Sequence, residues 1–237
     1  MLDIDQLNHS LETQGTLERL RWVCDTIGRN LVFTTSFGLE DQYITRLIGD
    51  NRLPIDIVTL DTGRLFPETY DLWSQTEETY DLKIKAVYPD QSALEKLIRQ
   101  HGINGMYKSH EARLSCCDTR KVAPLRRALS DADGWITGLR REQSSFRHDM
   151  RFASYDEDHK VIKINPLADC TRDNLVSAIR AFNIPYNALH DGGYTSIGCQ
   201  PCTRAIRVGE SEREGRWWWE RDGQSECGLH LEKKVAT

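Results

Sequence analysis

Residues 31–41 read Leu31-Val32-Phe33-Thr34-Thr35-Ser36-Phe37-Gly38-Leu39-Glu40-Asp41, which combines an apolar strand, a turn and the start of a helix. The first five residues are apolar or β-branched, as in a buried strand, whereas residues 39–48 have a helical composition. Backbone N–H groups and the positive end of a helix dipole make such a turn a seat for an anion. An ordinary strand-to-helix turn that needs a glycine explains this fragment equally well.

The same order of elements repeats downstream. Residues 55–60 form a second predicted strand that ends in Asp61-Thr62-Gly63, and Pro67 opens a helix at its favoured first position. Further strands are expected at 82–88, 135–139 and 161–166, and further helices from a capping box at Ser92, at 122–129 and from Thr171. This alternation predicts an α/β fold with a buried parallel sheet, whose ligand binds at the carboxyl ends of the strands.

The bulk properties restrict the function. A chain of 237 residues holds one full-sized domain, and a formal charge of -5 disfavours a general binder of nucleic acid or anionic membranes. No apolar run approaches the length of a membrane span, and the N-terminus lacks a secretory signal. We therefore expect a cytoplasmic protein with reduced thiols.

Four of the seven cysteines form two pairs. Cys116 and Cys117 are adjacent and are followed by two cations, whereas Cys199 and Cys202 have C-x-x-C spacing. Four thiolates suit zinc or an iron–sulfur cluster, and the adjacent pair favours a cluster with several iron corners. Zinc and four unrelated buried thiols remain alternatives, whereas disulfides are disfavoured by the odd count.

The C-terminal part has a different pattern. Residues 204–221 carry five Arg and four Glu around Trp217-Trp218-Trp219 and show no strand or amphipathic period. We expect one ligand-binding and cluster-binding domain over residues 1–205 and a mobile tail over 206–237. The tryptophans are expected to form a hydrophobic clamp or a partner contact, with stacking on a base as the alternative.

These stretches resemble the assimilatory adenylyl-sulfate reductases of the iron–sulfur type, within the phosphoadenylyl-sulfate reductase family. The resemblance extends from residue 35 to the end of the chain. It rests on Thr35-Ser36-Phe37-Gly38-Leu39-Glu40-Asp41, Leu60-Asp61-Thr62-Gly63, the segment from Cys116 to Leu125, the segment from Gly138 to Ser144, Cys199-Gln200-Pro201-Cys202 and Glu226-Cys227-Gly228-Leu229-His230.

The resemblance implies a fold, a reaction and a cofactor. The fold is a three-layer sandwich of the adenine-nucleotide alpha-hydrolase-like, PP-loop-related type. The thiol of Cys227 attacks the sulfur of adenylyl sulfate, AMP leaves, and a thioredoxin or glutaredoxin-like thiol releases sulfite. A [4Fe-4S] cluster on Cys116, Cys117, Cys199 and Cys202 has a structural and electrostatic role. A homo-oligomer is expected.

The resemblance also assigns residues. Lys121, Arg213 and Arg216 match cationic positions that neutralise the substrate, and His230 is expected to contact it. The nucleotide is expected at the strand ends, on Ser36, Phe37, Gly38, Asp61, Thr62 and Gly63. Arg140 and Arg141 follow a strand end and are predicted phosphate contacts, with ordinary surface charge as the alternative.

Two other functions compete with the reductase. A PP-loop enzyme that uses ATP shares the sheet but has a Ser-Gly-Gly-x-Asp-Ser turn, which this chain replaces by residues 36–41. A cluster-bearing nucleotide sensor leaves Cys227 beside His230 unexplained. Adenylyl sulfate is favoured over its 3′-phosphorylated form because the complete cysteine set usually accompanies it in this family, and dual use remains open.

Overall fold

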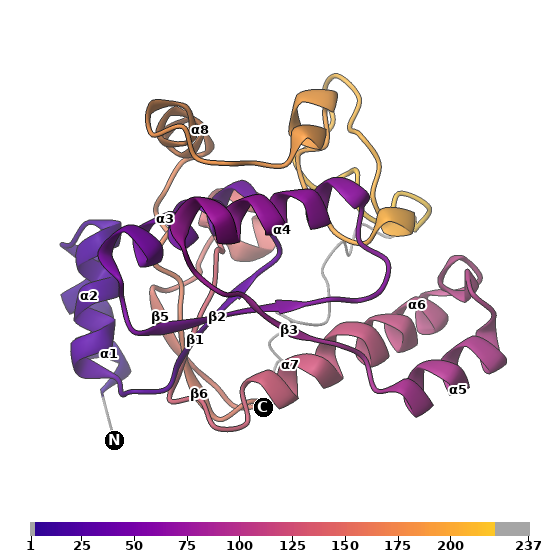
Figure 1. The fold of residues 1–237 in the computed structure, drawn as a ribbon, viewed down its shortest axis with the longest axis horizontal. Helices are drawn as coiled ribbons and strands as arrows, with labels where there is room; N and C mark the ends of the chain where they lie inside the picture. Colours follow the sequence, from indigo (N-terminus) through magenta and orange to yellow (C-terminus); the bar gives the residue numbers. More distant parts are fainter. Residues whose placement is uncertain (1–2, 221–237) are drawn as a thin grey trace.

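The computed structural model describes residues 3–220, and its centre is a six-stranded sheet with the order β3-β2-β1-β4-β6-β5 (Figure 1). Five neighbouring strands run parallel, and β5 pairs antiparallel with β6. The strands are β1 (Leu31–Thr35), β2 (Ile55–Leu60), β3 (Lys85–Val87), β4 (Gly134–Ile136), β5 (Ala153–Asp156) and β6 (Val161–Ile164). The predicted α/β class with a largely parallel sheet is confirmed.

Helices cover both faces of this sheet. They are α1 (Ile4–Glu12), α2 (Thr16–Thr26), α3 (Leu39–Asn51), α4 (Pro67–Tyr80), α5 (Gln91–His101), α6 (His110–Cys117), α7 (Ala123–Ala128) and α8 (Arg172–Ala181). A π-helical turn, Asp118–Val122, joins α6 to α7. Figure 1 shows α3 and α4 along one side of the sheet and α5, α6 and α7 along the other.

The alternation of side chains along β1 explains the three layers. Leu31 and Phe33 are buried in a core shared with α1, α2 and α3, whereas Val32 points to the other face and packs with Leu125 of α7. Successive side chains of a strand point to opposite faces, so an entirely apolar strand needs helices on both sides. The predicted three-layer sandwich follows from this packing.

Two local predictions need correction. The N-cap of α5 is Asp90, whose carboxylate accepts a hydrogen bond from the backbone N–H of Ala93 at 2.9 Å, so the helix begins before the predicted capping box at Ser92. Strand β5 was not predicted, because its sequence Ala-Ser-Tyr-Asp has no apolar run. Its hydrogen bonds come from the register with β6, in which Ala153 pairs with Ile164 and Asp156 with Val161.

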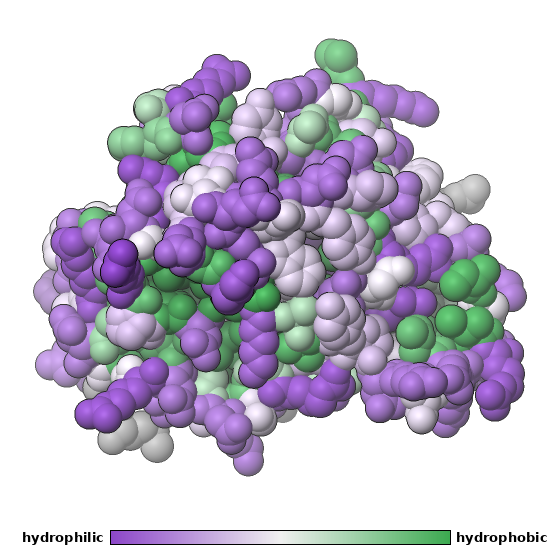
Figure 2. Space-filling model, viewed as in Figure 1, coloured by the Kyte–Doolittle hydropathy of each residue, from purple (hydrophilic) through white to green (hydrophobic). Residues whose placement is uncertain are grey.

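Figure 2 shows one face of the molecule, on which polar and charged residues surround scattered apolar patches. Within residues 3–220, no helix has the length and apolarity that a membrane span requires.

The topology predicts where a ligand binds. The sheet grows from β1 in both directions, to β2 and β3 on one side and to β4 on the other. In open parallel sheets the loops on either side of such a switch point diverge and leave a crevice at the carboxyl ends of the strands. The loops that follow β1, β2 and β4 line the main pocket of the described chain.

Candidate functional site

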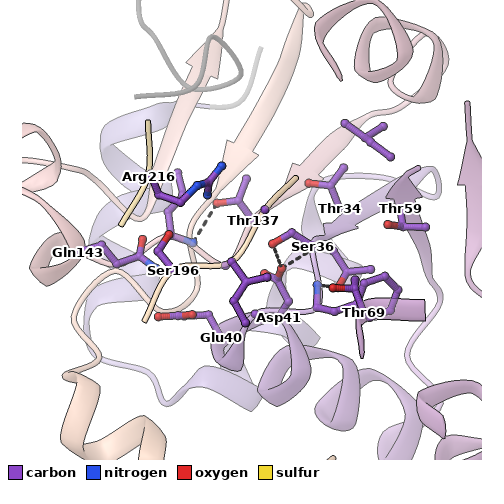
Figure 3. Close-up of a pocket in the computed structure, with 18 of the residues that line it drawn as sticks. Thr34, Ser36, Glu40, Asp41, Thr59, Thr69, Thr137, Gln143, Ser196 and Arg216 are labelled. Carbon is purple, nitrogen blue, oxygen red and sulfur yellow. Dashed lines mark hydrogen bonds between the residues drawn. The ribbon is translucent and has the colours of Figure 1, made fainter. Parts of the chain in front are cut away.

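The main pocket is a cavity of about 200 Å³ at the carboxyl ends of β1, β2 and β4 (Figure 3). Its walls come from the Ser36–Gly38 turn, from Thr59, Leu60 and Thr62, from Thr137–Leu139 and from two later segments around 195–198 and 212–216. In Figure 3, Ser36 and Asp41 lie side by side, and Arg216 reaches in from the C-terminal segment. The pocket is therefore built from segments that are far apart in the sequence.

A buried carboxylate occupies part of the predicted anion seat. Asp41 accepts hydrogen bonds from the backbone N–H of Ser36 at 2.6 Å and from its Oγ at 2.8 Å. Burial raises the pKa of Asp41 to about 6, against the opposing effect of the Ser36 hydrogen bonds. Gly138 faces the same carboxylate, and a Cβ there would lie 2.1 Å from Asp41 Oδ1. Close packing of Asp41 is thus the reason for a glycine at position 138.

Four cations line the pocket: Lys121, Arg147, Arg213 and Arg216. Three of them were predicted from the sequence, but Arg147 was not. Arg147 is 8 % exposed, and the 3-10 turn Ser145–Arg147 carries it into the wall. The signal that could have revealed it is its position a few residues beyond a predicted strand end, where ligand contacts concentrate.

Arg216 is held tightly at its position. Its guanidinium lies against Gly198, where a Cβ would come within 2.3 Å of Nη2. Its backbone forms an isolated antiparallel bridge with Thr203, and its side chain is buried. This packing fixes a positive charge at the pocket wall.

A second, smaller cavity of about 20 Å³ is lined by all four paired cysteines. Cys117, Cys199 and Cys202 are buried, and Cys116 is half-buried. Lys121 and Arg216 line both cavities, so the cysteine site and the main pocket are neighbours.

Local structure brings the two pairs together. Cys116 and Cys117 are the last residues of α6, where the chain widens into the π-helical turn Asp118–Val122. Such turns inside helices occur mostly at functional sites, because the extra residue redirects side chains. The other pair closes the 3-10 turn Gln200–Cys202, and Cys199 Sγ lies 3.3 Å from Thr62 Oγ1.

The small cavity is strongly cationic. Arg64, Arg113 and Arg120 line it beside Lys121 and Arg216. Burial and the neighbouring Cys199 raise the pKa of Cys202 to about 11, and the cations oppose that rise. Burial likewise raises the pKa of Cys116, with Arg120 as the main opposing group. The cations are therefore placed to stabilise several thiolates at once.

Two buried N–H groups beside the cysteines lack an acceptor among the described residues: Arg120 Nε and Trp217 Nε1. Burying such donors unpaired is costly, so their presence fits an electron-rich group between them and the thiols. Within residues 3–220 no group of three or more His, Cys, Asp and Glu side chains is arranged to hold a metal ion. The four thiols line one cavity, and four thiolates are a donor set of both zinc and iron–sulfur sites.

The first part of the predicted tail packs onto this site. Trp217 is 2 % exposed and its backbone N–H donates to the carbonyl of Cys202 at 3.3 Å. Arg113 pairs with Glu220, with Nε 2.8 Å from Oε1 and Nη2 2.9 Å from Oε2. Arg216 and Trp217 thus belong to the wall of the cysteine cavity, and Glu220 pairs with Arg113 of the same wall.

The remaining predicted residues divide into three groups. Ser36, Phe37, Gly38 and Thr62 line the main pocket, as predicted for the nucleotide site. Asp61, Gly63, Arg140 and Arg141 do not. Cys227 and His230 lie outside the described residues.

Each residue outside the wall has another set of contacts. Asp61 accepts from the backbone N–H of Gly63 and from the hydroxyl of Tyr70, both at 2.8 Å, and so shapes the turn after β2. Arg141 donates from Nε to the carbonyl of Met150 at 2.7 Å. Arg140 is fully buried among three carboxylates, which leaves its guanidinium no open face toward a phosphate.

Comparison with known proteins agrees with this geometry. Residues 30–205 match the phosphoadenosine phosphosulfate reductase domain. The chain belongs to this reductase family. It is 52% identical over 230 residues to the adenosine 5'-phosphosulfate reductase of Rhizobium meliloti (strain 1021), covering 97% of this chain and 86% of that one. The Allochromatium vinosum adenosine 5'-phosphosulfate reductase is 46% identical over 216 residues, covering 91% and 84%.

Solved structures of the family and of a wider group share the fold. A phosphoadenylyl-sulfate reductase from Candida auris, crystallised with phosphate, is 30% identical with a TM-score of 0.73, covering 84% of this chain and 97% of that one. Yeast FAD synthetase is 15% identical with a TM-score of 0.51, covering 84% and 73%. The second likeness shows a shared fold alone.

Proposed function

We propose that the chain reduces adenylyl sulfate to sulfite and AMP, with Cys227 as the nucleophile and a thioredoxin or glutaredoxin-like dithiol as the reductant. The observation that carries the proposal is the cationic pocket at the sheet's switch point, adjoining a four-cysteine cavity. Family membership and the names of the curated relatives support the same reaction.

The chemistry has two transfers. The Cys227 thiolate attacks the sulfonyl sulfur, the bond from sulfur to the phosphate oxygen breaks, and AMP leaves with the electron pair. A thiolate of the reductant then attacks the S-sulfocysteine at the Cys227 sulfur, sulfite leaves, and the second thiol of the reductant releases Cys227 as a thiolate. The dithiol is oxidised to a disulfide, which supplies the two electrons of the reduction.

The pocket cations stabilise the first transfer. Adenylyl sulfate is an anion that repels a thiolate, so charge on the sulfonate and the departing phosphate must be neutralised. Lowering the pKa of a thiol from about 8.5 to about 6.5 raises its thiolate fraction at pH 7 roughly 25-fold and costs roughly tenfold in nucleophilicity. Lys121, Arg147, Arg213 and Arg216 therefore act mainly on the substrate anion, where transition-state charge develops.

The cysteine cavity is proposed to hold a [4Fe-4S] cluster on Cys116, Cys117, Cys199 and Cys202. A bound cluster would supply a compact negative charge and a rigid crosslink between α6 and the 199–202 turn. The Thr62 hydroxyl and the unpaired N–H groups of Trp217 and Arg120 lie beside the cysteines and would be the donors available to it. Iron and acid-labile sulfide analysis on anaerobically purified protein, with zinc measured in parallel, distinguishes the cluster from the zinc alternative.

Intact-protein mass spectrometry tests the reaction. Anaerobically purified protein is incubated with adenylyl sulfate and no thiol, beside a Cys227→Ser control and a parallel sample given the 3′-phosphorylated nucleotide. A gain of one SO3 unit in the wild type alone establishes nucleophile and substrate class, and the parallel sample reports dual use. No adduct from an iron-replete sample would overturn the proposal and favour the sensor or the ATP-using enzyme.

Three assignments are carried forward on the sequence alone. These are a cytoplasmic location, a homo-oligomeric state, and closure of the segment after residue 205 over the substrate. The last is tested by protease protection of residues 206–237 in the presence of AMP, which is expected to increase.

A further inference from the structure

Arg140 lies at the centre of a buried ionic network beside the main pocket. Its Nε lies 2.6 Å from Glu40 Oε1, its Nη1 3.1 Å from Glu142 Oε2, and its Nη2 3.1 and 3.2 Å from the two oxygens of Glu212. Arg172 Nη1 lies 3.2 Å from the same Glu212 carboxylate. The side chain of Arg140 is fully buried, and those of Glu40 and Glu212 are 12% and 17% exposed. A residue predicted to bind phosphate thus holds other parts of the protein together.

Glu212 is the member of the network that comes from the C-terminal segment. It lines the main pocket, and the next residue, Arg213, is a pocket cation. Its backbone is fixed as well, because Thr195 Oγ1 donates to the Glu212 carbonyl at 2.5 Å. Both the side chain and the main chain at position 212 are therefore anchored immediately before Arg213.

The anchor connects three separate elements. Glu40 is in the first turn of α3, Arg172 is the first residue of α8, and Arg140 follows β4. All three belong to the packed body of the fold, whereas Glu212 belongs to a segment of turns without a regular strand or helix. Local backbone hydrogen bonds, such as that from the Arg216 N–H to the Arg213 carbonyl at 2.9 Å, hold the turn itself, and the ionic contacts attach that turn to the body of the fold.

We propose that Glu212 is a positioning residue: by pairing with Arg140 and Arg172 it orients Arg213 toward the anionic group of the substrate. The role deepens the proposed function and rests on it for the identity of that group. The Glu212 carboxylate faces Arg140 and Arg172, and these two cations reduce its repulsion of an anionic ligand.

The negative charge of Glu212 must be paired with cations before an anionic ligand can bind beside it. A bare carboxylate in the wall would repel an anionic substrate. Arg140 Nη2 contacts both Glu212 oxygens and Arg172 Nη1 contacts one of them, which reduces that repulsion and restrains the carboxylate. A charge-assisted hydrogen bond contributes about 10- to 100-fold in affinity, and it is lost when the cation that makes it is displaced. Breaking the anchor should therefore affect the anion-binding step strongly, even though no contacting group is removed.

A binding cycle tests the proposal in full-length, iron-loaded protein that carries Cys227→Ser to prevent turnover. Glu212→Gln is expected to weaken adenylyl sulfate binding about 10- to 100-fold by calorimetry. In an Arg213→Ala background the same change should add less than about twofold, because the residue through which Glu212 acts is already missing. Full weakening in both backgrounds would indicate general damage and would overturn the proposal, as would unchanged binding in Glu212→Gln.

A second readout needs no substrate. Arg213 is a trypsin site, so mass-resolved trypsin cleavage after Arg213 in ligand-free protein should accelerate several-fold in Glu212→Gln. Because Glu212 directly precedes Arg213, each rate is divided by the cleavage rate of a synthetic peptide of residues 208–218 with the same sequence. Equal rates in Glu212→Gln and wild type refute the anchor. Failure of wild-type protein to bind adenylyl sulfate would instead refute the proposed function and leave the cleavage result to decide the anchor.

Discussion

Replacing Asp41 by asparagine removes one buried carboxylate and keeps nearly the same shape. The amide oxygen of the new side chain can still accept from the Ser36 N–H and hydroxyl, which lie 2.6 and 2.8 Å from Asp41 Oδ2. If the new NH2 group lacks a hydrogen-bond partner, the free-energy cost of that loss is the same at every pH. The pH dependence of the difference between variant and wild type therefore isolates the titration of Asp41.

The size of that dependence follows from the pKa. Burial raises the pKa of Asp41 from 3.8 to about 6, so the folded state binds this proton more tightly than the unfolded state. Stability is then highest below the unfolded pKa and falls as the pH rises toward 6. One pKa unit corresponds to about 1.4 kcal/mol, which makes the full loss about 3 kcal/mol and the loss between pH 5 and pH 8 about 1.5 kcal/mol.

Thermal unfolding of both proteins at pH 5, 6, 7 and 8 measures this. A free-energy change of 1 kcal/mol shifts the midpoint of a chain this size by about 2–4 °C, so the midpoint of Asp41→Asn should rise relative to wild type by about 3–6 °C from pH 5 to pH 8. Asp56→Asn, at an exposed position of β2, is the control for the loss of one carboxylate. A variant-minus-wild-type difference that stays constant across these pH values would refute the assignment.

Three further substitutions test the site and the core. Gly198→Ala places a Cβ 2.3 Å from Arg216 Nη2 and should therefore displace the guanidinium. Adenylyl sulfate binding should weaken roughly tenfold, with unchanged iron content. An unchanged affinity would show that the guanidinium can move aside without loss of its contact to the ligand. Trp217→Phe keeps the ring packing but removes the unpaired indole N–H, so the absorbance of the proposed cluster should bleach several-fold faster in air; equal rates would exclude a hydrogen bond from that N–H to the cluster. Arg19→Met removes a bidentate pair with the half-exposed Asp169 and the buried hydrogen bonds from Arg19 to the carbonyls of Leu11 and Pro166, and should lower the unfolding free energy in urea by about 1–3 kcal/mol; an unchanged free energy would contradict the argument.

The fold was predictable where the sequence is locally consistent. The expected strands at 31–35 and 55–60 have the observed bounds, because apolar runs end there in turn residues. The strand expected at 82–88 is only Lys85–Val87, since a strand at the sheet edge ends where its partner β2 ends. Pairing partners set such limits, and a single sequence does not contain them.

The sequence predicts which residue types form the site, but it predicts less well in which direction each side chain points. The four cysteines line one cavity, as their spacing suggested. Arg140 and Arg147 show what was missed: both follow β4, but only Arg147 lines the main pocket. The partners that bury Arg140 lie 100 and 72 residues away at Glu40 and Glu212. A local pattern cannot distinguish an arginine that meets a ligand from one that meets distant carboxylates.

The distribution of charge within the pocket determines how an anionic nucleotide lies in it. The Ser36 N–H, which the sequence offered as an anion seat, already donates to Asp41, and Glu40 lies beside it. A carboxylate that fills the turn repels a phosphate chain there, whereas Lys121 and Arg216 lie beside the cysteine cavity. The phosphosulfate should therefore point toward the cysteines and the nucleoside toward the strand ends. That orientation disfavours a triphosphate seated on the turn, and it places the sulfonyl sulfur beside the C-terminal segment that leads to Cys227.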